Sequence, residues 1–171
     1  TDFMNLEMRI VASGFLEKNP DIDLQLVGEA YVDQSFELMR RNEIDLIIAP
    51  LFQGIRDYCD FVEVSENPMY AVMRRDHPLA DRETIQFMEL YNEHIITRSF
   101  TMHRAIQVCC NHLRVDMPPN FEFIRRAGDR NNRMRILNEV SVGQGITFYF
   151  QNDIRPLSMR NLVYIPVEGV P

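Results

Sequence analysis

Apolar and polar residues alternate with two different periods along the first fifty positions. Apolar residues recur every three or four positions from Met4 to Phe15, which predicts a helix that ends at Asn19–Pro20. The segment Ile22–Val27 alternates between apolar and polar residues, which predicts a strand with one covered face. A short helix over Asp33–Asn42 and a continuous apolar strand over Ile44–Pro50 are expected next. This order of elements is typical of α/β proteins built around a parallel sheet.

A polar segment divides the chain near its middle. Two strands, Phe61–Val64 and Met69–Met73, are predicted before it, and the second of them is continuously apolar. The segment Arg74–Ile85, RRDHPLADRETI, then brings basic residues, a His-Pro step and further charges, and we call it the elbow. Because helices and strands begin to alternate again after the elbow, we interpret it as a crossover between two α/β lobes.

The second half of the chain repeats the alternation. The expected elements are a short helix over Thr84–Leu90, a strand over His94–Thr97, a helix over Met102–Leu113, a strand over Phe121–Ile124, a helix over Asn132–Val142, a strand after the glycines of VGQGITFYF, and a strand over Leu162–Val167. The first lobe is too small to stand alone, so we expect the last strand to return to it. We therefore predict lobe I from residues 1–73 plus 162–171, and lobe II from residues 74–161.

Composition and charge narrow the classes of function. The chain has 171 residues, of which 46% are hydrophobic and 25% charged, and its formal net charge is −7. Such an acidic surface repels phosphate, so the chain is a poor candidate for binding nucleic acid by itself. No apolar run approaches the roughly 20 residues of a membrane span, and no secretory leader begins the chain, so we expect no membrane contact. Three cysteines, Cys59, Cys109 and Cys110, suit reduced thiols in the cytoplasm better than a disulfide framework.

Six segments occur in the order and spacing of a known family. They are FLEKNPDIDLQLVGEA, RRNEIDLIIAP, HPLA, HIITRSFT, VGQGITF and LVYIPV. As a set they resemble the effector-binding domain of LysR-type transcriptional regulators. Asn42 stands where the family usually has Gly, and both residues tolerate a left-handed helix exit. Two departures border the ligand cleft in relatives: Ala30 follows Glu29 where the family often has Gly, and no Pro follows the GQGI turn.

The resemblance implies a fold and a set of partners. The fold is the type II periplasmic-binding-protein fold, in which two Rossmann-like lobes are joined by two crossing strands and hold a small molecule between them. The resemblance also implies that the chain is truncated at both ends and lacks the winged helix-turn-helix, so that DNA is bound only through that missing part. The implied self-association is an antiparallel dimer, or a tetramer, in which the first helix packs on helix Met102–Leu113 of a partner chain.

Three loops are candidates for binding a small anionic effector. Backbone N–H groups at helix N-termini and nearby hydroxyls favour negative charge, and in the family the corresponding loops line the effector site. The candidate effector-binding residues are Thr1, Thr97, Arg98, Ser99, Thr101, Gly145, Ile146 and Thr147. Arg98 is the most specific of these candidates, because a guanidinium beside a helix N-terminus can hold a carboxylate through two hydrogen bonds. The alternatives are plain helix caps for the Ser and Thr residues, a tight turn for the glycines and a surface charge for Arg98.

Other polar clusters favour structural roles. The residues predicted to form the hinge, because the family uses HPLA as a turn between lobes, are Arg74, Arg75, His77 and Pro78. The segment Ile124–Arg135 holds five arginines, which form either a phosphate site or, more commonly, a solvated face or subunit contact. His103 and Cys110 lie two helical turns apart, about 10 Å, which is too far to chelate one ion directly. We therefore expect no metal site and no cofactor.

These patterns together predict the ligand-sensing domain of a cytoplasmic LysR-type DNA-binding regulator. It is expected to bind a small, anionic metabolite between its lobes and to alter the geometry of a homo-oligomer. No enzyme motif such as G-x-S-x-G or H-E-x-x-H is present, so no catalytic residue is predicted. Two alternatives stay open: a solute-binding protein of a transporter, and an enzyme on the same two-lobed scaffold.

Overall fold

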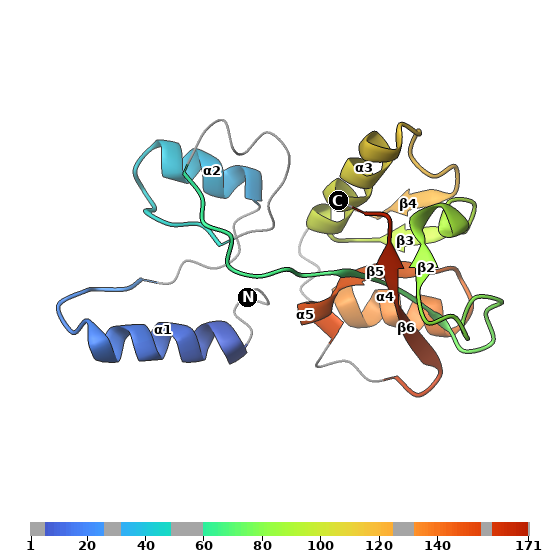
Figure 1. The fold of residues 1–171 in the computed structure, drawn as a ribbon, viewed down its shortest axis with the longest axis horizontal. Coiled ribbons are helices and arrows are strands. Elements are labelled where there is room, and N and C mark those ends of the chain that lie inside the picture. Colours follow the sequence, from blue (N-terminus) through green and yellow to red (C-terminus); the bar gives the residue numbers. More distant parts are fainter. Residues whose placement is uncertain (1–5, 26–31, 49–59, 125–131, 155–158, 171) are drawn as a thin grey trace. The chain divides into compact units, whose positions relative to one another are not determined.

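The computed structural model describes residues 6–25, 32–48, 60–124, 132–154 and 159–170. The chain divides into two compact units, Thr1–Ala49 and Pro50–Pro171. The first unit contains the helices α1 (Leu6–Lys18) and α2 (Val32–Arg40), which are drawn in blue in Figure 1. Both helices lie where the spacing of apolar residues predicts them.

Both helices of the first unit end through an asparagine. At the end of α1, the Asn19 backbone N–H and the Asn19 side-chain amide both donate to the Phe15 carbonyl, at 3.0 and 2.9 Å. After α2, Asn42 adopts a φ of 55°, and the Glu43 N–H donates to the Leu38 carbonyl at 2.9 Å. The left-handed exit expected for Asn42 is therefore confirmed, because Asn tolerates positive φ better than most residues.

Three segments predicted as strands before β1 are not strands in the structure. Their described residues are 22–25, 44–48 and 61–64. Most of their apolar side chains are exposed, and the exposed fraction reaches 86% for Val62. A strand exists only where a neighbour supplies ladder hydrogen bonds, and none of the described strands pairs with these segments. The other positions of the predicted strands lie outside the described residues.

The second unit is built around paired strands. They are β1 (Met69–Arg74), β2 (Ile85–Gln86), β3 (Ile95–Thr97), β4 (Phe121–Phe123), β5 (Thr147–Phe150) and β6 (Leu162–Glu168). β1 lies between β5 and β6 and is antiparallel to both, while β2 pairs in parallel with the other edge of β6. β3 and β4 pair in parallel, and a bridge between Ile95 and Ile146 joins β3 to the segment that enters β5.

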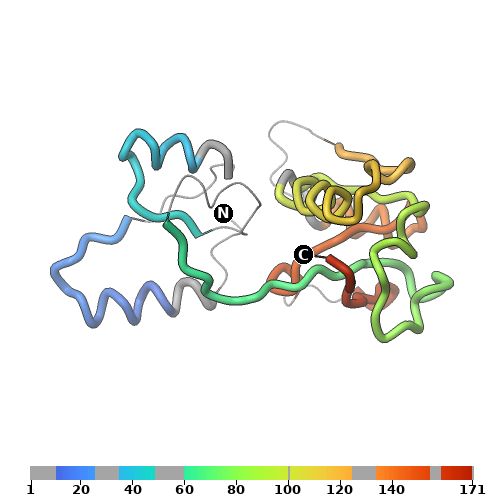
Figure 2. Tube along the Cα trace, turned by 45° about the horizontal axis from the view of Figure 1, so that its top comes forward, coloured from blue at the N-terminus to red at the C-terminus, as the bar shows by residue number. Residues whose placement is uncertain are grey.

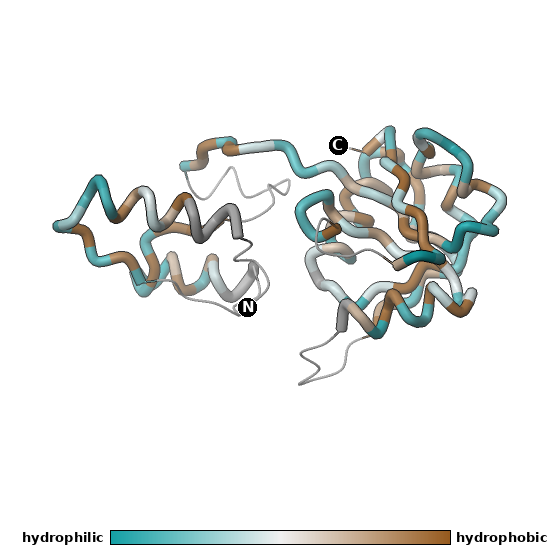
Figure 3. Tube along the Cα trace, turned by 90° about the horizontal axis from the view of Figure 1, so that it is seen from below, coloured by the Kyte–Doolittle hydropathy of each residue, from teal (hydrophilic) through white to brown (hydrophobic). Residues whose placement is uncertain are grey.

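Helices cover both faces of these strands, and each face has its own core. On one face, α3 (Phe100–Leu113) and the 3-10 helix η2 (Phe87–Leu90) pack on β1 through Ala71 and Met73. On the other face, α4 (Asn132–Ser141) packs on Val72. Successive residues of a strand point to opposite faces, so β1 separates the two cores. Figure 1 shows α3 and α4 on opposite sides of the strands, and Figure 3 shows apolar residues running along the strands inside this unit.

Most elements of the second unit confirm the sequence-based prediction; besides the segment 61–64, the segment Thr84–Leu90 differs. The helix predicted over Thr84–Leu90 is replaced by β2 and η2, because the backbone of Ile85 pairs with Val167 of β6. The short helix α5 (Gln151–Ile154), which follows β5, was not predicted. The pairing of two residues with a distant strand is a tertiary interaction, so a local pattern does not reveal it.

The elbow is a turn, as predicted, and it is tied to the start of β6. The His77 N–H donates to the Arg74 carbonyl at 3.1 Å. The Arg75 N–H donates to the Asn161 carbonyl at 3.0 Å, and Arg75 Nε donates to the Arg160 carbonyl at 2.8 Å. Figure 2 shows β6, in red, returning beside β1. β1 and β6, both assigned to lobe I, thus pair with each other, but β2 and β5 join the same sheet, and the lobe boundaries stay a prediction.

Candidate functional site

Three of the predicted effector-binding residues meet where β3 ends and α3 begins. Ser99 is the N-cap of α3, and its Oγ accepts a hydrogen bond from the Met102 N–H at 3.2 Å. Thr97 Oγ1 accepts from the Ser99 N–H at 3.3 Å, which holds the cap in place. The N–H groups of Phe100 and Thr101, in the first turn, have no acceptor inside the helix. This helix end, which we call the α3 N-terminus, therefore presents partial positive charge.

The turn before β5 lies directly beside β3. The Ile146 N–H donates to the His94 carbonyl at 2.8 Å, and the Ile96 N–H donates to the Ile146 carbonyl at 2.9 Å. Gly145 adopts a φ of 135°, and a Cβ there would lie 2.4 Å from the His94 carbonyl oxygen, so the turn requires glycine. Thr147 is buried, with 1% of its surface exposed. Two of the three predicted loops are therefore neighbours, whereas Thr1, in the third, lies outside the described residues.

Arg98 is separated from Thr97 and Ser99 by the direction of its side chain. Ile96 and Arg98 line a pocket next to α4, whereas Ile95 packs in the core beside α3, so alternate residues of β3 face opposite sides. The Arg98 side chain is 2% exposed, and its Nη2 donates to Glu139 Oε1 of α4 at 2.8 Å. Arg98 is therefore not a surface charge, and it does not lie with the α3 N-terminus.

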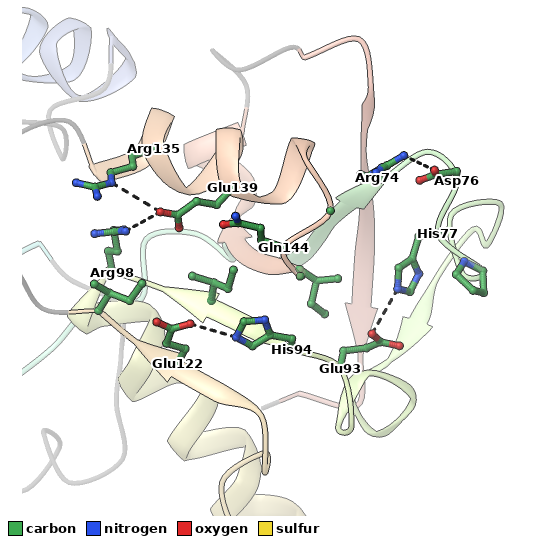
Figure 4. Close-up of a pocket in the computed structure, with 16 residues that line it drawn as sticks. Arg74, Asp76, His77, Glu93, His94, Arg98, Glu122, Arg135, Glu139 and Gln144 are labelled. Atoms are coloured by element: carbon green, nitrogen blue, oxygen red, sulfur yellow. Dashed lines mark hydrogen bonds and ion pairs between the residues drawn. The ribbon is translucent and has the colours of Figure 1, made fainter.

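The pocket beside α4 has a volume of about 910 Å³, and we call it the α4 pocket (Figure 4). Its walls come from the elbow, the β3 and β4 region, α4 and the turn before β5, all within the second unit. It is lined by the predicted site residues Arg98, Gly145 and Ile146 and by the predicted hinge residues Arg74, His77 and Pro78. Thr97, Ser99, Thr101, Thr147 and Arg75 do not line it.

Charged side chains in the α4 pocket are arranged in pairs. His94 Nε2 lies 3.1 Å from Glu122 Oε2, and His77 Nε2 lies 3.5 Å from Glu93 Oε2. Arg74 contacts Asp76 within the elbow. At the end of the pocket nearest α4, Arg135 Nε lies 3.7 Å from the same Glu139 oxygen that Arg98 contacts. Figure 4 shows these pairs following one another along the pocket.

The acidic residues of the α4 pocket are not among the site residues predicted from the sequence. A signal for one pair exists in the segments HIIT and FEFI, where a polar residue begins one predicted strand and interrupts the other. The register of β3 and β4 pairs Ile95 with Phe121, which brings His94 close to Glu122. Only the register reveals this pair, because the two residues are 28 positions apart in sequence.

Burial disfavours the charged forms of three side chains of α3. Burial raises the pKa of the Cys109 thiol to about 12 and also raises the pKa of Cys110, so neither is an activated thiolate. Burial, with a contribution from Arg104, lowers the pKa of His103. Cys109 and Cys110 are both free and buried, and Cys59 lies outside the described residues. Within the described ranges, no cluster of three or more His, Cys, Asp or Glu side chains is placed to hold a metal ion.

No helix in the described part of the chain is both long enough and apolar enough to span a lipid bilayer.

The fold of this chain belongs to a known family of ligand-binding domains. Residues 10–171 match the model of the LysR substrate binding domain, so the chain belongs to this family. Among curated proteins it is similar to the transcriptional dual regulator GltC of Bacillus subtilis (strain 168), with 25% identity over 162 residues. That match covers 92% of this chain and 51% of GltC, so the chain spans about half the length of its relative.

Solved structures of similar domains show the fold. The effector binding domain of QuiR in complex with shikimate matches with a TM-score of 0.71 and 14% identity, over 96% of this chain and 76% of that one. The CcmR regulatory domain of Synechocystis PCC6803 in complex with 2-PG gives 0.63 and 22%, with the same coverage of 96% and 76%. The BenM effector binding domain with benzoate gives 0.63 and 16%, over 95% and 73%. The chain therefore has the periplasmic-binding-protein-like α/β fold that the sequence predicts.

Proposed function

We propose that this chain is the effector-sensing part of a LysR-type transcriptional regulator and that its effector is a small, anionic metabolite. The observation on which the proposal rests is the family match over residues 10–171. The similarity to GltC, a transcriptional regulator, supports a regulatory role over that of a solute-binding protein or an enzyme. Shikimate and benzoate, the ligands in the QuiR and BenM structures, are both carboxylates, which supports an anionic effector.

The α3 N-terminus is the part of the second unit best suited to hold an effector anion. Its first-turn N–H groups and the helix dipole favour negative charge, and the hydroxyls of Ser99 and Thr101 add hydrogen-bond donors. Thr97 contributes by holding Ser99 in the cap position. The turn of Gly145, Ile146 and Thr147 is bridged to β3 at Ile95 and is proposed as a neighbouring wall. Thr1 and the location of the effector between two lobes stay predictions from the resemblance.

The regulatory mechanism is a difference in affinity between conformations. An effector that binds one arrangement of the protein more tightly shifts the population toward that arrangement. In the whole regulator, DNA would be bound by a part outside this chain, and a homo-oligomer would pass the shift to that part. Because its target is DNA, such a regulator acts in the cytoplasm.

Thermal unfolding with carboxylate ligands tests the proposed effector site. A ligand at a hundred times its Kd stabilises the native state by about 2.7 kcal/mol, and roughly 2–4 °C of Tm accompany each kcal/mol in a chain of this size. We expect at least one compound of a panel containing shikimate and benzoate to raise Tm, and Ser99→Ala and Thr101→Val to reduce that rise. Each rise is measured against the same variant without ligand, because losing the Ser99 cap itself costs about 1 kcal/mol.

Two results would count against this proposal at different levels. A rise in Tm that is the same in wild type and in both variants would remove the effector from the α3 N-terminus. If the full-length protein binds an operator fragment with the same affinity and footprint with and without a stabilising ligand, the regulatory role is wrong.

A further inference from the structure

We propose that the α4 pocket is a second ligand site, for a small carboxylate that also bears hydroxyl or ammonium groups. This inference goes beyond the proposed function and does not rest on it. The pocket lies wholly in the second unit, and its lining comes from the face of β3 that carries Ile96 and Arg98. Thr97 and Ser99 take no part in that lining, so a ligand here leaves the α3 N-terminus free.

One end of the α4 pocket has an excess of positive charge. Arg98 and Arg135 share a single carboxylate oxygen of Glu139, at 2.8 and 3.7 Å. Arg98 uses only Nη2 in that contact, and its buried Nε and Nη1 have no hydrogen-bond partner among the described residues. A buried guanidinium with unpaired donors is costly, and an incoming carboxylate would supply the missing acceptors through charge-assisted hydrogen bonds.

The second carboxylate oxygen of Glu139 requires a hydrogen-bond donor on the ligand at the same end of the pocket. Glu139 Oε2 is buried and has no hydrogen-bond donor among the described residues. A ligand that brings only a carboxylate would leave this oxygen unsatisfied. A hydroxyl or ammonium group next to the ligand carboxylate would donate to it, so the Arg98–Glu139 pair selects a ligand with acceptors and donors side by side.

The rest of the α4 pocket favours further donors on the ligand. Glu122 and Glu93 lie farther from Arg98, and each carboxylate has a histidine as its neighbour, at 3.1 and 3.5 Å. Figure 4 shows Arg98 and Arg135 at one end, the His77–Glu93 pair at the other and the His94–Glu122 pair between them. Isoleucines that line the pocket between these polar groups supply apolar contacts for a carbon chain. The pocket therefore has its arginines Arg98 and Arg135 at one end and its carboxylate–histidine pairs along the rest of its length.

A set of matched six-carbon compounds separates these requirements. Gluconate has hydroxyls beginning next to its carboxylate, 2-aminohexanoate has an ammonium group next to its carboxylate, sorbitol lacks the carboxylate, and hexanoate lacks the donors. Calorimetric titration of the 171-residue chain with each compound measures the affinities. We expect gluconate or 2-aminohexanoate to bind at least about tenfold more tightly than both sorbitol and hexanoate. If neither gluconate nor 2-aminohexanoate binds more tightly than sorbitol and hexanoate, the proposed ligand class is overturned.

Isoleucine methyl resonances locate the bound ligand. Ile96, Ile124 and Ile146 line the α4 pocket, whereas Ile106 of α3 is buried in the core on the opposite face. In a chain labelled at isoleucine methyl groups, the tighter-binding compound should shift the resonances of Ile96 and Ile124 and leave that of Ile106 unchanged. Shifts confined to other isoleucines, or no shift with any of the four compounds, would overturn the proposal.

Substitutions of the charged pair test the role of Arg98. Arg98→Gln should lower the affinity for the tighter-binding carboxylate by roughly tenfold or more, since a charge-assisted bidentate contact is lost. Because Arg98 is buried and the variant can be less stable, Arg135→Gln, at an arginine whose side chain is 45% exposed, serves as a second test and should weaken binding less. Arg104→Gln, on the exposed side of α3, is the matched control and should bind as wild type does. Unchanged affinity in both Arg98→Gln and Arg135→Gln would overturn the assignment.

These readouts are independent of DNA and of the α3 N-terminus. If the regulatory role or the Ser99 site fails its own test, the titrations of the α4 pocket still report whether a carboxylate binds there. Conversely, a failure of gluconate and 2-aminohexanoate to bind leaves the proposed effector at the α3 N-terminus untouched.

Discussion

For single residues, the residue type gives the chemistry of the side chain, and the fold decides the direction in which that side chain points. Thr97, Arg98 and Ser99 are consecutive, and the sequence alone predicts that they form one anion-binding loop. The strand geometry of β3 instead directs Arg98 toward Glu139, while Thr97 supports the Ser99 cap of α3. A residue type therefore indicates which chemistry is possible, but the face on which its side chain lies decides where that chemistry is available.

The first prediction at this scale concerns the glycines before β5. Gly145→Ala should reduce the free energy of unfolding by about 2–5 kcal/mol. The reasons are that its φ of 135° disfavours any side chain and that an added Cβ would clash with the His94 carbonyl oxygen. Gly143→Ala is the matched comparison and should cost only about 1–2 kcal/mol, since a Cβ there meets the flexible Arg74 side chain at 3.0 Å. Urea unfolding measures both, and equal losses would contradict this difference.

The second prediction at this scale concerns the thiols of α3. Raising the pKa of Cys109 from 9.0 to about 12 lowers its thiolate fraction at pH 8 by about a thousandfold. We expect Cys109 and Cys110 to resist alkylation by iodoacetamide in the native chain and to react readily in urea. Peptide mass spectrometry assigns the labelled cysteine, so that Cys59 is followed separately. Native labelling of Cys109 at the rate seen in urea would show that burial does not protect it.

Whether a helix or strand can be predicted depends on whether the sequence pattern that indicates it is local. Helices α1, α2, α3 and α4 were predicted because a 3.6-residue period and capping residues are written in one continuous segment. The segments 22–25, 44–48 and 61–64 have the apolar pattern of strands but no paired neighbour among the described strands. Strand formation requires hydrogen bonds to another part of the chain, so the pattern alone was insufficient there.

The contact between α3 and β4 leads to a prediction of pH dependence. The His103 ring stacks on Phe123 with centroids 4.9 Å apart and lies 5.5 Å from Phe121. Burial lowers the pKa of His103 in the folded state, so the unfolded chain binds its proton more readily. The contribution of this residue to stability is therefore present above about pH 6.5 and is lost as the pH falls through the folded pKa.

Urea unfolding of wild type and His103→Phe at pH 7.5 and pH 5 measures this effect. Wild type should lose more stability than the variant between these two pH values, because the variant keeps an aromatic ring at this position and has no proton to bind. His112, which is exposed in the last turn of the same helix, provides the control substitution His112→Phe, which should keep the pH dependence of wild type. The same slope in wild type and in His103→Phe would contradict the assignment to His103.

At the scale of the whole molecule, residues 10–171 form a LysR substrate binding domain, and DNA binding belongs to the proposed function. The two units, Thr1–Ala49 and Pro50–Pro171, each have their own secondary structure. The predicted self-association is a property of this scale, because it depends on surfaces from a second copy. It belongs to the proposed function and is open to a direct measurement.

Light scattering after size-exclusion chromatography tests the predicted dimer. At micromolar concentrations we expect a mass of twice one chain, or of four times one chain if dimers pair. Val108→Arg, at a partly buried position of α3, should lower that mass if α3 takes part in the contact. Gln107→Arg, at its neighbour on the same helix, is the control for added charge. A monomer at all concentrations would contradict the predicted self-association.

The sequence by itself determined the family, the helices α1 to α4, the turn at the elbow and most of the strands of the second unit. It did so because capping, periodicity and ordered motifs are local, and they survive in the one-dimensional chain. Only the tertiary structure decided that Arg98 meets Glu139, that His94 meets Glu122 and that residues 22–25, 44–48 and 61–64 form no ladder with the described strands. Those outcomes depend on strand register and on which face a side chain takes, and both are fixed only when distant segments pack together.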